Sequence, residues 1–204
     1  MNNPFGWLFI GSDVILIDMR MEKVMLQVEN VTQGTSGKSP FFLMLREAGG
    51  SRKLSVMIGP FEAQAILVVM RGVQVSRPLM ADVCIHSLQA FGVVIRELYI
   101  YKVLDGVYYS MLELEQEGVV NYVDVRTSDG VALALRFGAP IYTSESLLSR
   151  EHIFEDSHGA ISIPVSSVGM EVLQEALVRA IREEDYELAA QLRDEIARRE
   201  QKSS

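Results

Sequence analysis

An Asp-Gly pair between two β-rich segments is the feature that most constrains the fold of this chain. Asp105-Gly106 follows a β-rich run at residues 93–103 and precedes a second run at 107–114. Asp-Gly suits the two-residue turn of a β-hairpin, because both positions tolerate a positive φ. A further turn and a third β-rich run at 119–125 follow. The pattern predicts an antiparallel meander.

The rest of the chain groups its strands and helices instead of alternating them. Alternating apolar and polar residues predict three strands before Pro60, and helical spacing predicts two helices after it. Beyond the meander we expect a short helix stopped by Gly138, a last strand and a terminal helix. This grouping favours an α+β fold, with a mixed, largely antiparallel sheet and packed helices, over a doubly wound fold. The predicted elements are strands 23–31, 41–46, 53–58 and 140–143 and helices 61–71, 78–91, 130–137 and 144–150.

Composition divides the chain into four parts. Residues 1–20 form an N-terminal extension, whose apolar stretches leave open a strand docked on the body. Residues 21–155 form the predicted body, and residues 156–169 shift toward Ser, Gly and His, as a linker does. Residues 170–201 carry two amphipathic stripes, with Asp185 as a predicted N-cap between them, and so predict a helical hairpin. Because two short helices bury too little surface to be stable alone, this hairpin should pack on the body, on a second copy or on another protein.

Charge and cysteine content exclude several classes of function. The formal net charge of −8 argues against a nonspecific basic coat for nucleic acid, so any nucleic-acid function needs a local site. The single cysteine, Cys84, excludes an intramolecular disulfide framework and a multi-cysteine metal cluster. The N-terminus lacks the basic start of an export signal, and no uncharged run reaches the ~20 residues of a membrane span. We therefore expect a cytoplasmic protein without membrane contact.

Five short blocks between residues 55 and 142 form a pattern that is more specific than any one of them. They are SVMIGPFEAQA at 55–65, Arg77-Pro-Leu79 with Asp82, DVRTSD at 124–129, VALALR at 131–136 and APIY at 139–142. In order and spacing they resemble the bifunctional nuclease (DNase/RNase) domain family of bacteria and plants, over roughly Met21 to Glu155. The EEDYELAAQLRD run at 183–194 is similar to the UVR helical hairpin of the UvrB and UvrC repair proteins.

The first resemblance implies hydrolysis of phosphodiester bonds in DNA and RNA, and the second implies protein–protein contact, commonly between two such hairpins. Hydrolysis needs positive charge to offset the phosphate, a group that positions water and a donor for the developing negative charge. Carboxylates in the blocks suit Mg²⁺ or Mn²⁺, and arginines suit phosphate. The predicted metal ligands are Glu62, Asp82, Asp124 and Asp129; the predicted catalytic residues are Asp124, Arg126, Asp129, Arg77 and Asp82; the predicted substrate contacts are Arg126, Ser128 and Arg77.

Several of these residues also have a structural explanation. Glu62 falls in the first turn of a predicted helix, where the helix dipole favours a carboxylate. Arg77 and Asp82 can equally form an ion pair across the start of the second helix. Ser128 is also explained by a structural role alone, as the N-cap of the helix that follows it. Asp129 is favoured by the dipole of the same helix.

Asp124 and Arg126 give the clearest signal of a site. They lie two residues apart on a strand and therefore share one face, beside the start of a helix. A polar face beside a helix N-terminus is what an anion site requires. We expect one cleft that gathers Asp124, Arg126, Ser128, Asp129, Arg77 and Asp82.

One block departs from the family pattern, which usually continues Arg-Pro-Leu with Thr-His-Asp. This chain has Met80-Ala81-Asp82, so the histidine expected at Ala81 is absent. His86, one helical turn beyond Asp82, is a speculative substitute. Cys84 and His86 nevertheless fit core or surface packing better than a nucleophile and base. Gly130 replaces a usual alanine, at a cost of up to ~1 kcal/mol of helix propensity.

Three functions remain open. The leading one is a cytoplasmic, metal-dependent nuclease that binds DNA or RNA at a local site and uses its hairpin to bind a protein partner or a second copy, which makes a homo-oligomer the expected state. The second is a non-catalytic adaptor with a degenerate nuclease domain, favoured by the acidic charge, by Ala81 and by the hairpin. The third is a small-anion or nucleotide-binding regulator that uses the corner between Arg126 and Ser128 without hydrolysis.

Overall fold

A seven-stranded sheet organises the body of the chain. The computed structural model describes residues 5–10, 13–18, 22–33, 40–155, 161–162, 170–182 and 185–202. The strands of this sheet are β3 (Lys23–Gln33), β4 (Phe41–Glu47), β5 (Lys53–Ile58), β6 (Val94–Leu104), β7 (Val107–Gln116), β8 (Val119–Arg126) and β9 (Ile141–Ser144). Their order is β5-β4-β3-β9-β6-β7-β8, and every neighbouring pair is antiparallel except β6 and β9. The predicted α+β class with a mixed, largely antiparallel sheet is confirmed.

The Asp-Gly turn forms as its residue types demand. Asp105 and Gly106 have φ values of 50° and 79°, and Leu104 pairs directly with Val107 across the turn. Two positive φ values in a two-residue loop match the right-handed twist of the flanking strands. The meander predicted from this turn is confirmed as β6, β7 and β8.

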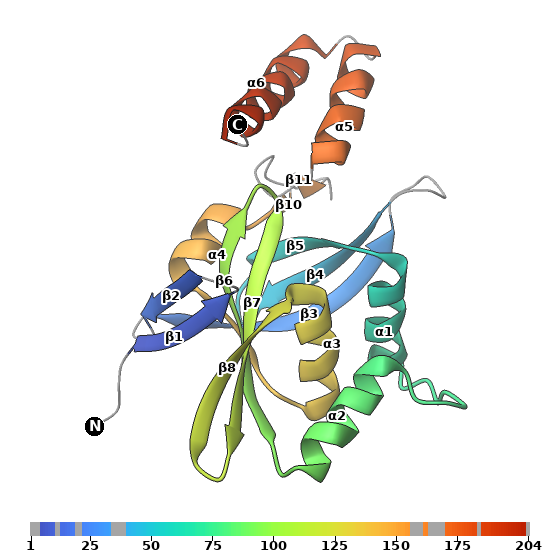
Figure 1. The fold of residues 1–204 in the computed structure, drawn as a ribbon. Coiled ribbons are helices and arrows are strands. Elements are labelled where there is room, and N and C mark those ends of the chain that lie inside the picture. Colours follow the sequence, from blue (N-terminus) through green and yellow to red (C-terminus); the bar gives the residue numbers. More distant parts are fainter. Residues whose placement is uncertain are drawn as a thin grey trace.

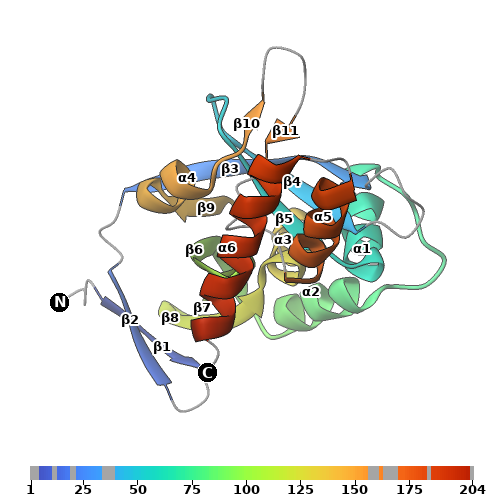
Figure 2. The same cartoon turned by 90° about the horizontal axis from the view of Figure 1, so that it is seen from above.

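Three helices cover one face of the sheet, as Figures 1 and 2 show together. They are α1 (Pro60–Met70), α2 (Met80–Ala90) and α3 (Thr127–Phe137). A fourth helix, α4 (Glu145–Glu151), contributes Leu147 and Leu148 to the same core. The opposite face of the sheet carries a smaller cluster around Tyr99 and Met111, because successive residues of a strand point to opposite faces.

Helix α3 is the central helix of this layer, since it packs against α1, α2 and the strands of the meander. Gly130 permits the close approach: a Cβ there would lie 2.5 Å from Leu98 Cδ1 and 3.1 Å from Val125 Cγ1. The glycine therefore has a packing role that its helix propensity alone does not indicate.

Two helix starts differ from the expectation by more than one residue. The helix predicted from residue 130 begins at Thr127, and its N-cap is Arg126, not Ser128. The helix predicted from Pro78 begins at Met80, because the Asp82 carboxylate accepts a hydrogen bond from the Leu79 amide at 2.7 Å and fixes the start.

The chain ends outside the main sheet form smaller units. At the N-terminus β1 (Phe5–Ile10) and β2 (Asp13–Asp18) pair antiparallel, and β1 lies beside β8, so part of the predicted extension is a strand hairpin close to the body. β10 (Phe154–Glu155) pairs with β11 (Ile161–Ser162). Apart from β11, the predicted linker at 156–169 lies outside the described residues.

The C-terminal helices pack on each other as a pair (Figure 1). They are α5 (Met170–Arg182) and α6 (Tyr186–Lys202), and Asp185 caps α6 by accepting a hydrogen bond from the Leu188 amide at 3.1 Å. The predicted hairpin and its cap are confirmed. None of the described helices is both long and apolar enough to span a membrane. The pair buries Leu173, Ala180, Ala189, Leu192 and Ile196 and exposes Val178, Ile181, Tyr186 and Leu188.

Candidate functional site

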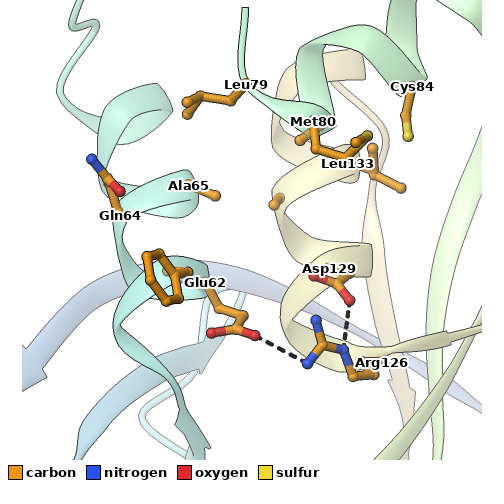
Figure 3. A pocket seen from close by; sticks show the side chains of 12 residues that line it. Glu62, Gln64, Ala65, Leu79, Met80, Cys84, Arg126, Asp129 and Leu133 are labelled. Atoms are coloured by element: carbon orange, nitrogen blue, oxygen red, sulfur yellow. Dashed lines mark hydrogen bonds and ion pairs between the residues drawn. The ribbon is translucent and has the colours of Figure 1, made fainter.

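A pocket of about 520 Å³ lies between α1, α2 and α3. Its walls are mainly apolar and include Ala65, Leu79, Ala132 and Leu133. Figure 3 shows an acidic and basic cluster at one end and the apolar side chains farther along. We call the cavity the interhelical pocket.

Arg126 lies at the polar end of the interhelical pocket between two carboxylates. Its Nη1 is 3.0 Å from Glu62 Oε1, and its Nε donates to Asp129 Oδ2 at 2.7 Å. The hydrogen bond to Asp129 and the nearby negative charges raise the pKa of Arg126, so the guanidinium stays charged. The side chain is 70% exposed. In Figure 3 the third nitrogen of the guanidinium points between the two carboxylates toward the cavity, and it has no hydrogen-bond partner among the described residues.

Helix starts place both carboxylates. Glu62 is in the first turn of α1 and Asp129 in the first turn of α3, where the helix dipole favours negative charge. Gly59, the N-cap of α1, leaves space for Glu62, because a Cβ at that position would lie 2.4 Å from Glu62 Oε2. Arg126 is the N-cap of α3, and it therefore bridges the N-terminal ends of two neighbouring helices.

Asp82 does not join this cluster. Its Oδ1 accepts a hydrogen bond from Arg136 Nε at 2.5 Å, and Arg136 Nη1 also donates to the carbonyls of Ala65 and Ala132 at 3.0 Å each. The Arg136 side chain is only 6% exposed. Its hydrogen bond, followed by that from the Leu79 amide, lowers the pKa of Asp82. Asp82 thus holds α2 against the end of α3, and the ion pair suggested for it has Arg136, not Arg77, as its partner.

Asp124 lies apart from the pocket. Its Oδ1 accepts a long hydrogen bond from the Tyr101 hydroxyl at 3.4 Å, on the face of the sheet opposite the three helices. Burial, reinforced by the charge of Asp124, raises the pKa of Tyr101. The two-residue spacing of Asp124 and Arg126 on a strand was predicted correctly. The Arg126 side chain, however, turns at the end of the strand toward Glu62 and Asp129.

The expectation of one cleft is therefore wrong for four of its six residues. Arg77 lies in the exposed loop between α1 and α2 and forms no ion pair with a described residue. Ser128 is buried in the first turn of α3 and does not line the pocket. Arg126 and Asp129 do line it, together with Glu62.

The metal site expected from four carboxylates does not form among the described residues. Within the described residues no group of three or more His, Cys, Asp or Glu side chains is placed to hold a metal ion. The four-carboxylate set is accordingly not assembled. Glu62 and Asp129, which share Arg126, still suit Mg²⁺, since that ion is commonly bound through one or two carboxylates with water and substrate phosphate as the other ligands.

Most residues that line the pocket were missed or discounted in the sequence. Phe61, Met80 and Cys84 line the pocket, and so does Ala81, the position of the family histidine. They lie within two residues of Glu62 or Asp82 in the sequence, which was the available signal, but helix packing was needed to bring α1 and α2 to one cavity. His86 lines a different cavity beside Arg136, so it does not replace the missing histidine in this one.

Comparison with known proteins gives two matches along the chain. The bifunctional nuclease domain matches residues 43–156, and the UvrB/uvrC motif matches residues 170–202. The chain is 33% identical over 155 residues to "Uncharacterized protein MT1877" of Mycobacterium tuberculosis (strain CDC 1551 / Oshkosh), which covers 76% of this chain and 84% of that protein. "Uncharacterized protein Rv1829" of strain ATCC 25618 / H37Rv gives the same values. "Bifunctional nuclease 1" of Arabidopsis thaliana is 23% identical over 212 residues, which cover 91% of this chain and 65% of that protein.

Proposed function

Because the chain belongs to the bifunctional nuclease domain family, we propose that it hydrolyses phosphodiester bonds of DNA and RNA in the interhelical pocket. The observation that supports this most directly is the setting of Arg126. Two carboxylates hold the guanidinium in place, and its third nitrogen is directed at the cavity. A donor held ready in this way suits a phosphate oxygen, on which negative charge develops during hydrolysis.

The residues of the cluster divide the chemistry between them. Arg126 binds the phosphate and stabilises the charge that develops on its oxygens. Glu62 accepts a proton from the attacking water as its oxygen bonds to phosphorus, and Asp129 keeps the guanidinium oriented. The bond from phosphorus to the leaving sugar oxygen breaks, and that oxygen takes a proton from solvent. A Mg²⁺ or Mn²⁺ ion bound by Glu62 and Asp129 would offset further phosphate charge.

Cleavage of labelled single-stranded DNA and RNA tests this proposal. Arg126→Gln should lower the rate at least ~100-fold, the usual effect of removing one donor to a developing oxyanion. Arg96→Gln is the matched control, because Arg96 is also an exposed, carboxylate-paired arginine but lies on β6 away from the pocket. EDTA should abolish cleavage, and added Mg²⁺ should restore it. Equal cleavage by wild type and Arg126→Gln would refute the proposed role of Arg126.

Ala81 favours a second candidate function, a non-catalytic adaptor. It lines the pocket at the position where the family pattern has histidine. If that histidine takes part in catalysis elsewhere in the family, Ala81→His should raise the cleavage rate, whereas Ser87→His on the exposed side of α2 should not. Absence of cleavage by both wild type and Ala81→His would favour the adaptor.

We also propose that the C-terminal helices bind a protein, with a second copy of the chain as the first candidate. The match to the UvrB/uvrC motif and the exposed apolar side chains of Val178 and Ile181 support this role. Ile181→Glu should lower the mass measured by sedimentation or abolish capture of a partner. Val73→Glu, at a comparably exposed valine of the loop after α1, should leave both unchanged, as should the cleavage rate in either variant.

A further inference from the structure

We infer that the interhelical pocket takes an unpaired base, so that the protein binds single-stranded nucleic acid in preference to a duplex. This inference rests on the proposed function, since it names the substrate of the same site. Three observations carry it: the size and walls of the pocket, two exposed apolar side chains that line it, and the shortage of positive charge around it.

The pocket has the size and lining of a small-ligand site. Its volume of about 520 Å³ lies within the range of ~300–1,000 Å³ that such sites span. That volume admits one base with its sugar and phosphate, whereas a stack of base pairs stays outside. The flat faces of a base match apolar walls such as Leu79 and Leu133, and the phosphate then falls at Arg126.

Two large apolar side chains that line the pocket are left in solvent. Phe61 in the first turn of α1 is 81% exposed, and Met80 at the start of α2 is 77% exposed. Exposed apolar groups gathered at a partly polar cavity mark a binding surface. An aromatic ring stacks on any base that has left its own stack, and a methionine thioether makes favourable contacts with aromatic rings.

The charge around the interhelical pocket disfavours binding of a duplex. Proteins that bind duplexes through the backbone neutralise many phosphates, but Arg126 is the one cationic side chain among the described residues that line this pocket, and two carboxylates offset it. The formal net charge of −8 adds repulsion. Contacts to the base must therefore supply most of the affinity. A paired base can reach the pocket only after unstacking, which lowers the affinity for a duplex.

Fluorescence anisotropy tests the inference with a labelled 12-nucleotide single strand and its duplex, both with a non-cleavable phosphorothioate backbone, at one salt concentration. We expect wild type to bind the single strand at least tenfold more tightly than the duplex. Phe61→Ala and Met80→Ala should each weaken single-strand binding at least fivefold and leave duplex binding unchanged. Phe91→Ala is the matched control, because Phe91 at the end of α2 is 74% exposed but does not line the pocket.

Equal affinity of wild type for the two probes would overturn the inference, and so would an equal loss of both affinities in Phe61→Ala. The outcomes that would refute the proposed nuclease function differ from those that would refute the base pocket. Equal cleavage of single strands and duplexes that depends on Arg126 would keep the nuclease and refute the base pocket. Strand-selective binding that depends on Phe61, without any cleavage, would support the pocket and refute hydrolysis.

Discussion

Helix α3 carries one arginine–carboxylate cluster at each end, and the two differ in burial. At its start Arg126 is 70% exposed and pairs with Glu62 of α1. In its last turn Arg136 is 6% exposed and pairs with Asp82 of α2. The same kinds of residue therefore do different work: the buried pair joins helices, whereas the exposed one leaves a donor available to a ligand. Burial separates the two roles, and sequence spacing does not.

The largest expected effect is on stability, from Arg136→Met. The substitution leaves Asp82 without its partner and removes the donor to the Ala65 and Ala132 carbonyls. Breaking a largely buried ion pair in this way should cost about 3 kcal/mol of unfolding free energy, as measured by urea denaturation. A loss below about 1 kcal/mol would mean that the pair holds nothing together.

A somewhat smaller loss is expected from Gly130→Ala. Helix propensity alone predicts a gain of up to ~1 kcal/mol, but the new methyl group would meet Leu98 Cδ1, which is fully buried. Overpacking of this kind should cost about 1–3 kcal/mol in the same urea measurement. Leu98→Val removes the group that is met, so a double-mutant cycle should show that the Gly130→Ala loss shrinks in the Leu98→Val background. A net gain in the wild-type background would show that α3 can shift on the sheet without cost.

Local pattern was enough to predict most of the fold. The Asp105-Gly106 turn, Pro60 at the first position of α1 and Asp185 at the start of α6 each act through backbone conformation or a nearby hydrogen bond. Such signals depend only on neighbouring residues, so they can be interpreted without knowledge of tertiary contacts. The family resemblance, which rested on the order and spacing of the blocks, is confirmed by the comparisons.

The site was predicted less well because its geometry depends on packing. Spacing on a strand placed Asp124 and Arg126 on one face, yet only the end of β8 and the start of α3 show which way Arg126 turns. Asp82 looked like a ligand in sequence, and its partner Arg136 lies 54 residues away. The order of charged residues along the chain therefore does not show which charges meet.

A pH titration sharpens the comparison between the two clusters. The hydrogen bond from Arg136 lowers the pKa of Asp82 below its value of ~3.9 in unfolded chains. The pair's contribution to stability is therefore fully present above about pH 4 and is lost as the pH falls through the folded-state pKa.

Urea unfolding at several values between pH 5 and pH 2 measures this loss. Wild type should lose more stability in acid than Arg136→Met, which lacks the main cause of the lowered pKa. Glu145, whose pKa Arg52 lowers to about 2, titrates in both proteins and cancels in the comparison. Parallel curves for the two proteins would show that the Asp82–Arg136 pair does not contribute to the loss of stability in acid.

The smallest effect on stability is expected where the effect on activity is largest, in Arg126→Gln. Because exposed ion pairs contribute about 0–1 kcal/mol, the variant should unfold within ~1 kcal/mol of wild type while cleavage falls as proposed above. The Arg126 side chain makes no capping hydrogen bond to α3, so the helix start does not depend on the guanidinium. A stability loss as large as that of Arg136→Met would mean that Arg126 holds α1 against α3, and the loss of cleavage would then report a disturbed fold instead of a lost phosphate contact.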